Sequence, residues 1–178
     1  LTINRGQRDR IEPGDPVVAA GGLVGVVRAA FERSARVQTI HDSMSVVGAA
    51  TLEGRVRGAV YGQGPGQLLQ FLPEDETEPI VPGSVLITSG FANSIYPKGI
   101  VIGRIERREV DPFGIMLSHV KPAAELERIE EVLVIRPAGR GAGATRQESF
   151  QMGRISIQAS NFAAHEDRFT STLITVTD

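Results

Sequence analysis

The chain has no cysteine, no tryptophan and no long apolar run, and each absence excludes a class of function. Without cysteine there is no disulfide, no thiol nucleophile and no thiolate metal site, and the redox compartment stays undetermined. No stretch approaches the ~20 apolar residues of a transmembrane helix, and no signal peptide is recognisable. Because Leu1 already lies in an apparent strand, we expect the chain to be a fragment of a longer protein.

Concentrated positive charge is also missing. The 19 Lys and Arg residues are scattered and are outnumbered by 21 Asp and Glu, whereas nucleic-acid binding needs a concentrated basic face. The three histidines, His41, His119 and His165, are far apart in sequence and form no H-x-x-x-H pair. We therefore expect no nucleic-acid partner and no metal site.

Short β-branched runs bounded by Gly, Pro or Asp dominate the chain and predict an all-β protein. Turn signals recur at about the spacing found in sandwiches and barrels. One stretch, PAAELERIEE from Pro122 to Glu131, predicts a single short connecting helix. A Gly-rich segment after Ile135 predicts a linker, followed by further strands at 155–160 and 170–178. The main predicted strands span 1–4, 16–20, 23–28, 36–41, 46–51, 56–61, 67–72, 85–88, 100–107, 115–120 and 131–135.

An internal repeat supports two related β units. Pro13-Gly14 and Pro82-Gly83 each precede a strand that runs to a glycine, at an offset of 69 residues without a gap. The second copy carries an insertion, FANSIYPKG at 91–99, before its return strand. The glycines that we expect at the corners of these units are Gly21, Gly22, Gly25, Gly90, Gly99 and Gly103.

The same glycines could be mistaken for a phosphate-binding loop. A dinucleotide loop needs G-x-G-x-x-G between a strand and a helix, and Gly21-Gly22-Leu-Val-Gly25 has neither the spacing nor a following helix. Gly62-Gln-Gly64-Pro65-Gly66 fails on spacing, and the Gly-rich run at 139–144 lies in the linker. We therefore expect no nucleotide and no other cofactor.

Catalysis by a serine nucleophile remains one alternative. His41, Asp42 and Ser43 are neighbours in sequence, and neighbours in an extended segment point to opposite sides and cannot form a triad. A site assembled from His41 or His119 with Ser89 stays open, although no nucleophile-elbow sequence accompanies it. A second alternative is a generic β module that binds peptide or carbohydrate, for which the chain offers few aromatic platforms.

Four strings, in order along residues 1–135, resemble one known family. They are LTINRG, IEPGDPVVAAGGLVGVV, LITSGFANSIYPKGIVIGRI and VKPAAELERIEEVLVI. Together they resemble the extracytoplasmic region of the MreC family of bacterial rod-shape-determining proteins. The resemblance implies a first small β-barrel made of 1–46 and 117–136, with a second barrel, 47–116, inserted in it. Residues 137–178 are left as a linker with extra strands, either a duplicated strand or a rearranged order of segments.

The resemblance also implies a function. Proteins of this family are non-catalytic scaffolds of the cell-elongation machinery that control rod shape and peptidoglycan synthesis. They self-associate as dimers or filaments and bind the elongation-specific penicillin-binding transpeptidase. They reach MreD and MreB through membrane and cytoplasmic segments that this chain lacks. The chain is then expected at the extracytoplasmic (periplasmic) face of the cytoplasmic membrane, anchored by an upstream helix, and not to be an enzyme.

The insertion at 91–99 is the candidate surface for protein interaction. It has no counterpart in the first copy, and it carries the residue types that interfaces favour. The candidate contacts are Phe91, Ile95, Tyr96 and Pro97. The alternative, left open by the sequence, is that Phe91 and Ile95 plug the end of the second barrel.

Overall fold

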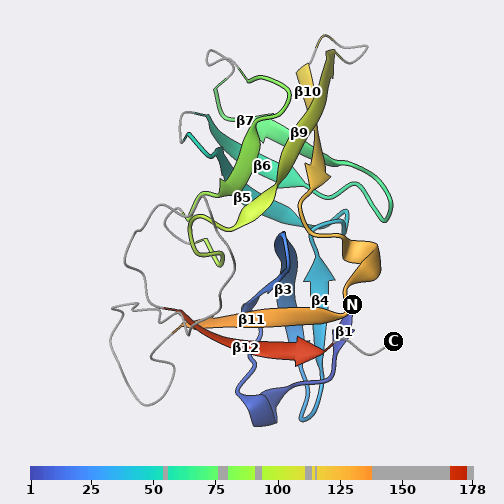
Figure 1. The fold of residues 1–178 in the computed structure, drawn as a ribbon, viewed down its shortest axis with the longest axis vertical. Helices are drawn as coiled ribbons and strands as arrows, with labels where there is room; N and C mark the ends of the chain where they lie inside the picture. The colour runs from blue at the N-terminus through green and yellow to red at the C-terminus, as the bar shows by residue number, and fades with distance from the viewer. Residues whose placement is uncertain are drawn as a thin grey trace.

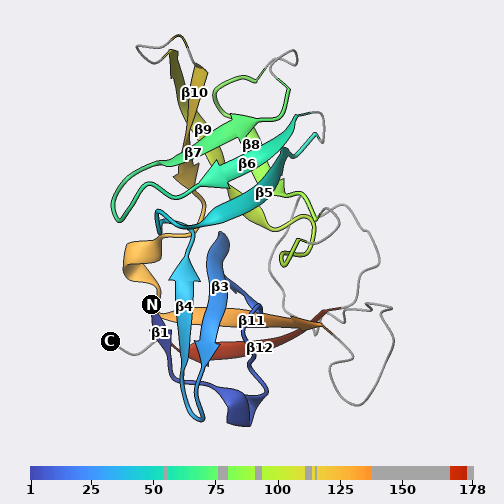
Figure 2. The same ribbon diagram turned by 180° about the vertical axis from the view of Figure 1, so that it is seen from behind.

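The computed structural model contains two β units, one above the other in Figure 1 and seen from behind in Figure 2. It describes residues 1–53, 56–75, 80–90, 94–110, 114, 116–137 and, for the backbone, 169–175. The strands are β1 (Thr2–Ile3), β2 (Pro16–Ala19), β3 (Gly22–Ala30), β4 (Ala35–Thr39), β5 (Val46–Thr51), β6 (Arg57–Tyr61), β7 (Leu69–Pro73), β8 (Val85–Thr88), β9 (Val101–Val110), β10 (Met116–Pro122), β11 (Glu131–Pro137) and β12 (Phe169–Thr175). The prediction of an all-β protein is confirmed.

The helical content of the described residues is limited to two 3-10 turns, η1 (Gln7–Asp9) and η2 (Leu126–Arg128). The predicted connecting helix is thus present as the single turn η2, and not over the whole of 122–131. The reason is tertiary: the Ala123 N–H donates to the Ile102 carbonyl at 3.0 Å, which ties the start of this connection to β9. Ala124 is also buried, so the segment follows the surface beneath it instead of coiling.

Six strands form a closed barrel in the order β10-β7-β6-β5-β8-β9, and each of them pairs with a neighbour on both sides. Inward-facing aliphatic side chains and the ring of Phe71 fill its interior. Closure pairs each barrel strand on both sides over at least part of its length, and the β9–β10 hairpin extends beyond the ladders with β8 and β7.

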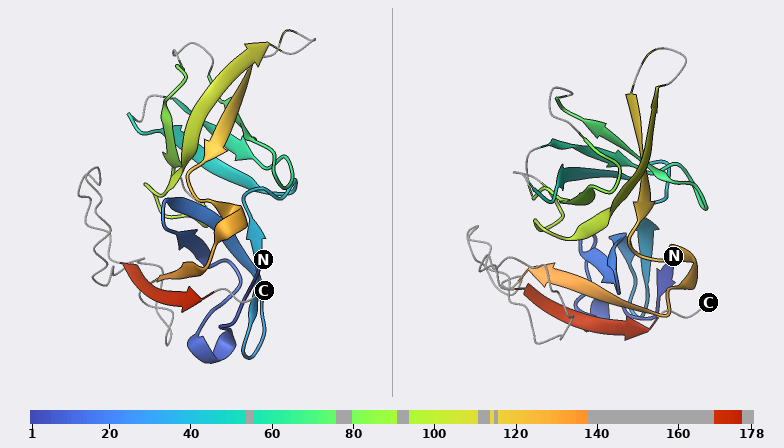
Figure 3. Two further views of the ribbon diagram at one scale, coloured as in Figure 1. Left: turned by 45° about the vertical axis from the view of Figure 1, so that its right-hand side comes forward. Right: turned by 45° about the horizontal axis from the view of Figure 1, so that its top comes forward.

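The other unit is an open sheet in the order β1-β4-β3-β2-β11-β12. It is strongly curved, and β11 and β12 cross over β3 and β4 (Figures 1 and 3). Val24, Val27 and Val37 on one side pack with Val132 and Val134 of β11 on the other, which gives this unit its own core. The edges of the sheet are β1 and β12.

The internal repeat is present in the structure as equivalent backbone hydrogen bonds. In the first copy the Gly14 N–H donates to the Val27 carbonyl at 2.8 Å, and in the second the Gly83 N–H donates to the Ile105 carbonyl at 2.7 Å. Gly25 lies opposite Val17 and Gly103 opposite Leu86, with a register shift one position later in both copies. The pair β2-β3 therefore corresponds to the pair β8-β9.

The two units share a core where they meet. Leu23 and Val26 lie in β3 of the open sheet, and Ile40 directly follows β4. All three nevertheless belong to the same buried cluster as the barrel interior. Leu126 in η2 packs against both cores. The strand β10 pairs with β7 and β9, so residues 117–122 of the expected first unit lie in the barrel. We propose that the division between the units falls after Pro122.

Candidate interaction surface

The candidate contact residues of the insertion at 91–99 lie in different environments. Phe91 lies outside the described residues. Ile95 is 51% exposed and Pro97 is half-buried, so both are placed where a partner can reach them. Tyr96 is only 5% exposed, which is a correction to its assignment as a surface contact.

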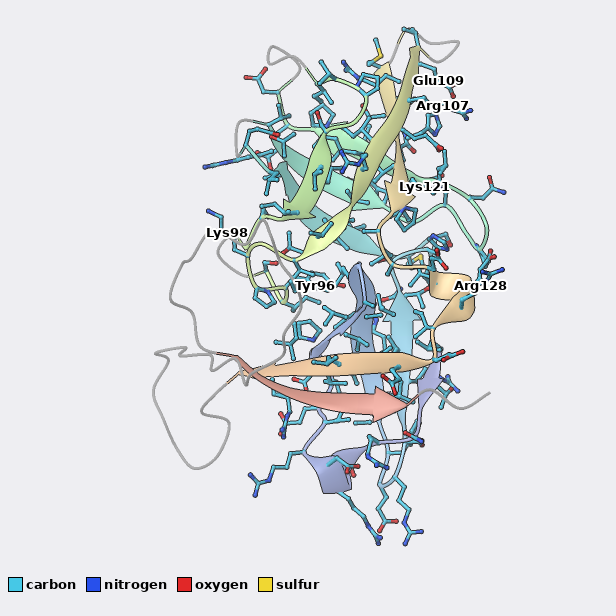
Figure 4. The ribbon with its side chains drawn as sticks, viewed as in Figure 1. Tyr96, Lys98, Arg107, Glu109, Lys121 and Arg128 are labelled. Carbon is cyan, nitrogen blue, oxygen red and sulfur yellow. The ribbon has the colours of Figure 1, made fainter. Side chains whose placement is uncertain are left out.

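Tyr96 instead belongs to the core that the two units share. It packs in the cluster that contains Leu23 and Val26 of the open sheet (Figure 4 shows its position between the units). Burial raises the pKa of the Tyr96 phenol to about 12, against a smaller opposite effect from the positive charge of Arg28. The ring is thus a structural contact that fixes the insertion onto the open sheet.

Thr88 closes the base of the insertion, a role that the sequence did not reveal. Its hydroxyl donates to the Pro97 carbonyl and accepts from the Ile100 N–H at 2.9 Å. Its carbonyl accepts from the Gly99 N–H at 3.0 Å. Thr88 is fully buried, so both of its hydroxyl contacts are shielded from water. Thr88, which precedes the insertion, is therefore bonded to residues at its far end, and Ile95 between them is exposed.

The six glycines fall into two geometric groups. Gly21, Gly90 and Gly99 have positive φ, of +102°, +63° and +94°. A Cβ on any of Gly22, Gly25 and Gly103 would lie within 2.4 Å of a backbone carbonyl oxygen. These glycines allow close approach of backbones at corners and between strands.

The residues of the hydrolase alternative do not form a hydrogen-bonded pair in the described part of the chain. His119 Nε2 lies 2.7 Å from Glu109 Oε1, on the exposed side of the β9–β10 hairpin. His41 Nε2 and Ser89 Oγ are buried, and neither has a hydrogen-bond partner among the described residues. Burial lowers the pKa of the His41 imidazole, with a smaller opposite effect from Glu127.

The described ranges contain neither a cluster of metal ligands nor a membrane-spanning helix. The described residues bring no three His, Asp or Glu side chains together as a metal site. They also contain no helix that is both long and apolar enough to cross a membrane.

Comparison with known proteins identifies the family. The family model described as rod shape-determining protein MreC, barrel core, matches residues 1–136. The chain belongs to the MreC family. The MreC-family resemblance found in the sequence is thereby confirmed, and this family is named for determining cell shape.

Individual relatives agree with this assignment. The cell shape-determining protein MreC of Haemophilus influenzae is 28% identical over 141 residues, which are 78% of this chain and 39% of that protein. Its counterpart in Escherichia coli K12 is 26% identical over 157 residues, 88% of this chain and 42% of that protein. The chain therefore spans only about four tenths of the length of these two relatives.

Solved MreC structures share the fold. The MreC of Listeria monocytogenes superposes with a TM-score of 0.68 at 28% identity, and covers 82% of this chain and 70% of its own. The MreC of Pseudomonas aeruginosa gives a TM-score of 0.68 at 25% identity, over 75% of this chain and 86% of its own.

Proposed function

We propose that this MreC-family chain is the barrel portion of a non-catalytic scaffold in the bacterial cell-elongation machinery. The observation that carries the proposal is the family match over residues 1–136 on two β units that share one core. A shared core holds the units as a single platform, which suits a protein that positions partners. The proposed role is control of rod shape and peptidoglycan synthesis through assembly.

The proposed location is the extracytoplasmic (periplasmic) face of the cytoplasmic membrane. Because the chain spans about four tenths to half of its curated relatives, an anchoring helix and the segments that reach MreD and MreB belong to the rest of the protein in this proposal. A fusion of the full-length protein to a periplasm-specific reporter tests the location. Activity of a cytoplasm-specific reporter at the barrel end would contradict it.

Self-association, as a dimer or a filament, is part of the proposed function. It is tested by sedimentation velocity on the full-length extracytoplasmic region over a wide concentration range. We expect the mean sedimentation coefficient to rise with concentration. A monomer that persists at the highest concentration contradicts self-association.

The proposed partner is the elongation-specific penicillin-binding transpeptidase, bound in part through the insertion at 91–99. The support is the exposure of Ile95 on a segment whose base Thr88 holds closed. The test expresses the full-length protein in a rod-shaped bacterium whose own MreC gene is deleted, and scores cell shape and co-purification of the transpeptidase. We expect Ile95→Ser to weaken co-purification and Val110→Ser, at a residue of similar exposure in β9, to leave it intact.

The same cells separate the scaffold from the hydrolase alternative. Labelling with a fluorophosphonate probe reports a reactive serine such as Ser89 next to a histidine. We expect no stoichiometric labelling and full rescue of rod shape by Ser89→Ala. Labelling of one serine together with loss of rescue would replace the scaffold by an enzyme.

A further inference from the structure

The outer surface of the barrel carries a small apolar pocket near its junction with the open sheet. It has a volume of about 250 Å³ and is formed by the ends of β8, β9 and β10 and the connection that follows. Its lining residues are Val85, Val101, Gly103, Arg104, Lys121, Pro122 and Ala123.

Two cations lie side by side in the lining of this pocket. Arg104 and Lys121 are register partners on β9 and β10, and both are exposed (Figure 4 shows Lys121 near the base of the hairpin). In the described part of the chain neither has a carboxylate partner, and the pocket lining contains no acidic residue. Like charges directly opposite each other on a sheet are unfavourable by themselves. An anionic ligand relieves this repulsion.

One of the cations is already held in place. Arg104 Nη1 donates to the Gly83 carbonyl at 2.6 Å, which fixes the guanidinium beside the pocket and leaves its other N–H groups for a ligand. A cation fixed before binding loses less side-chain entropy when a carboxylate arrives. Lys121, on a flexible stem, can then adjust to the second oxygen.

We propose that this pocket binds an acidic residue flanked by an aliphatic residue in an extended segment of a partner protein. The two cations pair with the carboxylate, and Val85, Val101 and Pro122 receive the aliphatic side chain. The volume lies below the ~300 Å³ at which small-molecule sites begin, so it suits one side chain and not an acyl chain. The inference rests on the proposed scaffold function and specifies the chemistry of one contact.

The test titrates the isotopically labelled 178-residue chain with three amidated, acetylated peptides and follows amide chemical shifts. The peptide GSVELEVSG carries both features, GSVQLQVSG lacks the charges, and GSSESESSG lacks the aliphatic side chains. We expect the first peptide alone to shift the amides of Val85, Arg104 and Lys121. The double variant Arg104→Gln/Lys121→Gln should bind it about fivefold more weakly, the upper range for exposed ion pairs. Arg107→Gln, on the same strand but outside the pocket, is the matched control.

Several outcomes overturn the proposal. The first is that GSVELEVSG at millimolar concentration shifts none of these amides. The second is that GSVQLQVSG or GSSESESSG binds as tightly as GSVELEVSG. The third is that Arg107→Gln weakens binding as much as the double variant does. Vesicles of phosphatidylglycerol and phosphatidylcholine form a parallel arm. If they bind through the same two cations while the peptide does not, the ligand is a lipid headgroup. Failure of these binding tests removes this contact and leaves the proposed scaffold function standing, because co-purification of the transpeptidase tests that function separately.

Discussion

Gly14 and Gly21 have nearly the same backbone conformation but opposite surroundings. Their φ values are +97° and +102°, a region that L side chains rarely adopt. A Cβ on Gly14 would meet nothing within 4 Å, whereas a Cβ on Gly21 would lie 2.5 Å from the Ala123 carbonyl oxygen. The pair therefore separates the cost of backbone strain from the cost of a clash with the connection that follows β10.

We expect Gly14→Ala to lower the free energy of unfolding by about 1 kcal/mol, the cost of a left-handed non-glycine residue. Gly21→Ala should lower it by about 3 kcal/mol, because the overlap with Ala123 adds the cost of overpacking. Urea denaturation followed by circular dichroism measures both. Equal losses of unfolding free energy in the two variants would show that Gly21 does not pack closely against Ala123 in solution.

The buried phenol of Tyr96 makes the free energy of unfolding depend on pH in the alkaline range. The pKa of its phenol is about 12 in the folded chain, against about 10 in an unfolded one. Between these values the unfolded state has lost the proton and the folded state keeps it. The stabilisation is therefore complete below pH 10 and is lost as the pH rises towards 12.

We expect the free energy of unfolding to fall by about 1.4 kcal/mol per pH unit between pH 10 and 12 on account of Tyr96. The difference between the wild type and Tyr96→Phe isolates this slope from the titration of lysines and arginines. Urea denaturation at half-unit pH steps measures it. Parallel curves for the two proteins would mean that the Tyr96 phenol is not buried in solution.

At the scale of elements, the strands were largely predictable from sequence and the contacts between them were not. The Pro-Gly turns at Pro13 and Pro82 located β2 and β8, because a turn residue and a β-branched run are local signals. The burial of Tyr96 was missed because Leu23 and Val26, its neighbours in the core, are over 65 residues away in the chain. The Thr88 contacts were missed for a related reason: a threonine in a strand looks the same whether or not it closes a loop.

The strand β12 supplies most of the pairing of β11. Seven residues of β11, from Glu131 to Pro137, are in register with β12, whereas only Leu133 and Val134 are in register with β2. Removal of β12 leaves β11 as an edge strand held by a short ladder. Edge strands open locally at a lower free-energy cost than strands paired on both sides.

We expect a chain that ends at Pro137 to remain folded but to exchange its β11 amides faster. Hydrogen exchange followed by NMR measures the change, and the amides of β7 in the closed barrel serve as the internal control. Those amides should keep their protection because β7 pairs with β6 and β10 in both chains. Unchanged exchange in β11 would argue that β12 does not pair there in solution.

At the scale of the whole molecule, the shared core determines whether the two units unfold together. Leu23 lies in β3 of the open sheet and is fully buried in the core of the barrel. Its neighbour Val24 is equally buried but belongs to the core of the open sheet alone. Adjacent residues on one strand thus point into different cores, since side chains alternate along a strand.

We expect Leu23→Ala to lower the free energy of unfolding by about 2–5 kcal/mol, the usual range for a buried leucine, while keeping one cooperative transition. Val24→Ala, which removes buried atoms from the core of the open sheet alone, is the variant for comparison. Tyrosine fluorescence from Tyr61 and Tyr96 reports on the barrel and the junction, and far-ultraviolet circular dichroism reports on both units. Coincident transitions in the wild type follow from a shared core, because neither unit can expose its half without disrupting the other. Two separate transitions in the wild type would mean that the units are independent domains and that the platform is not a single rigid body.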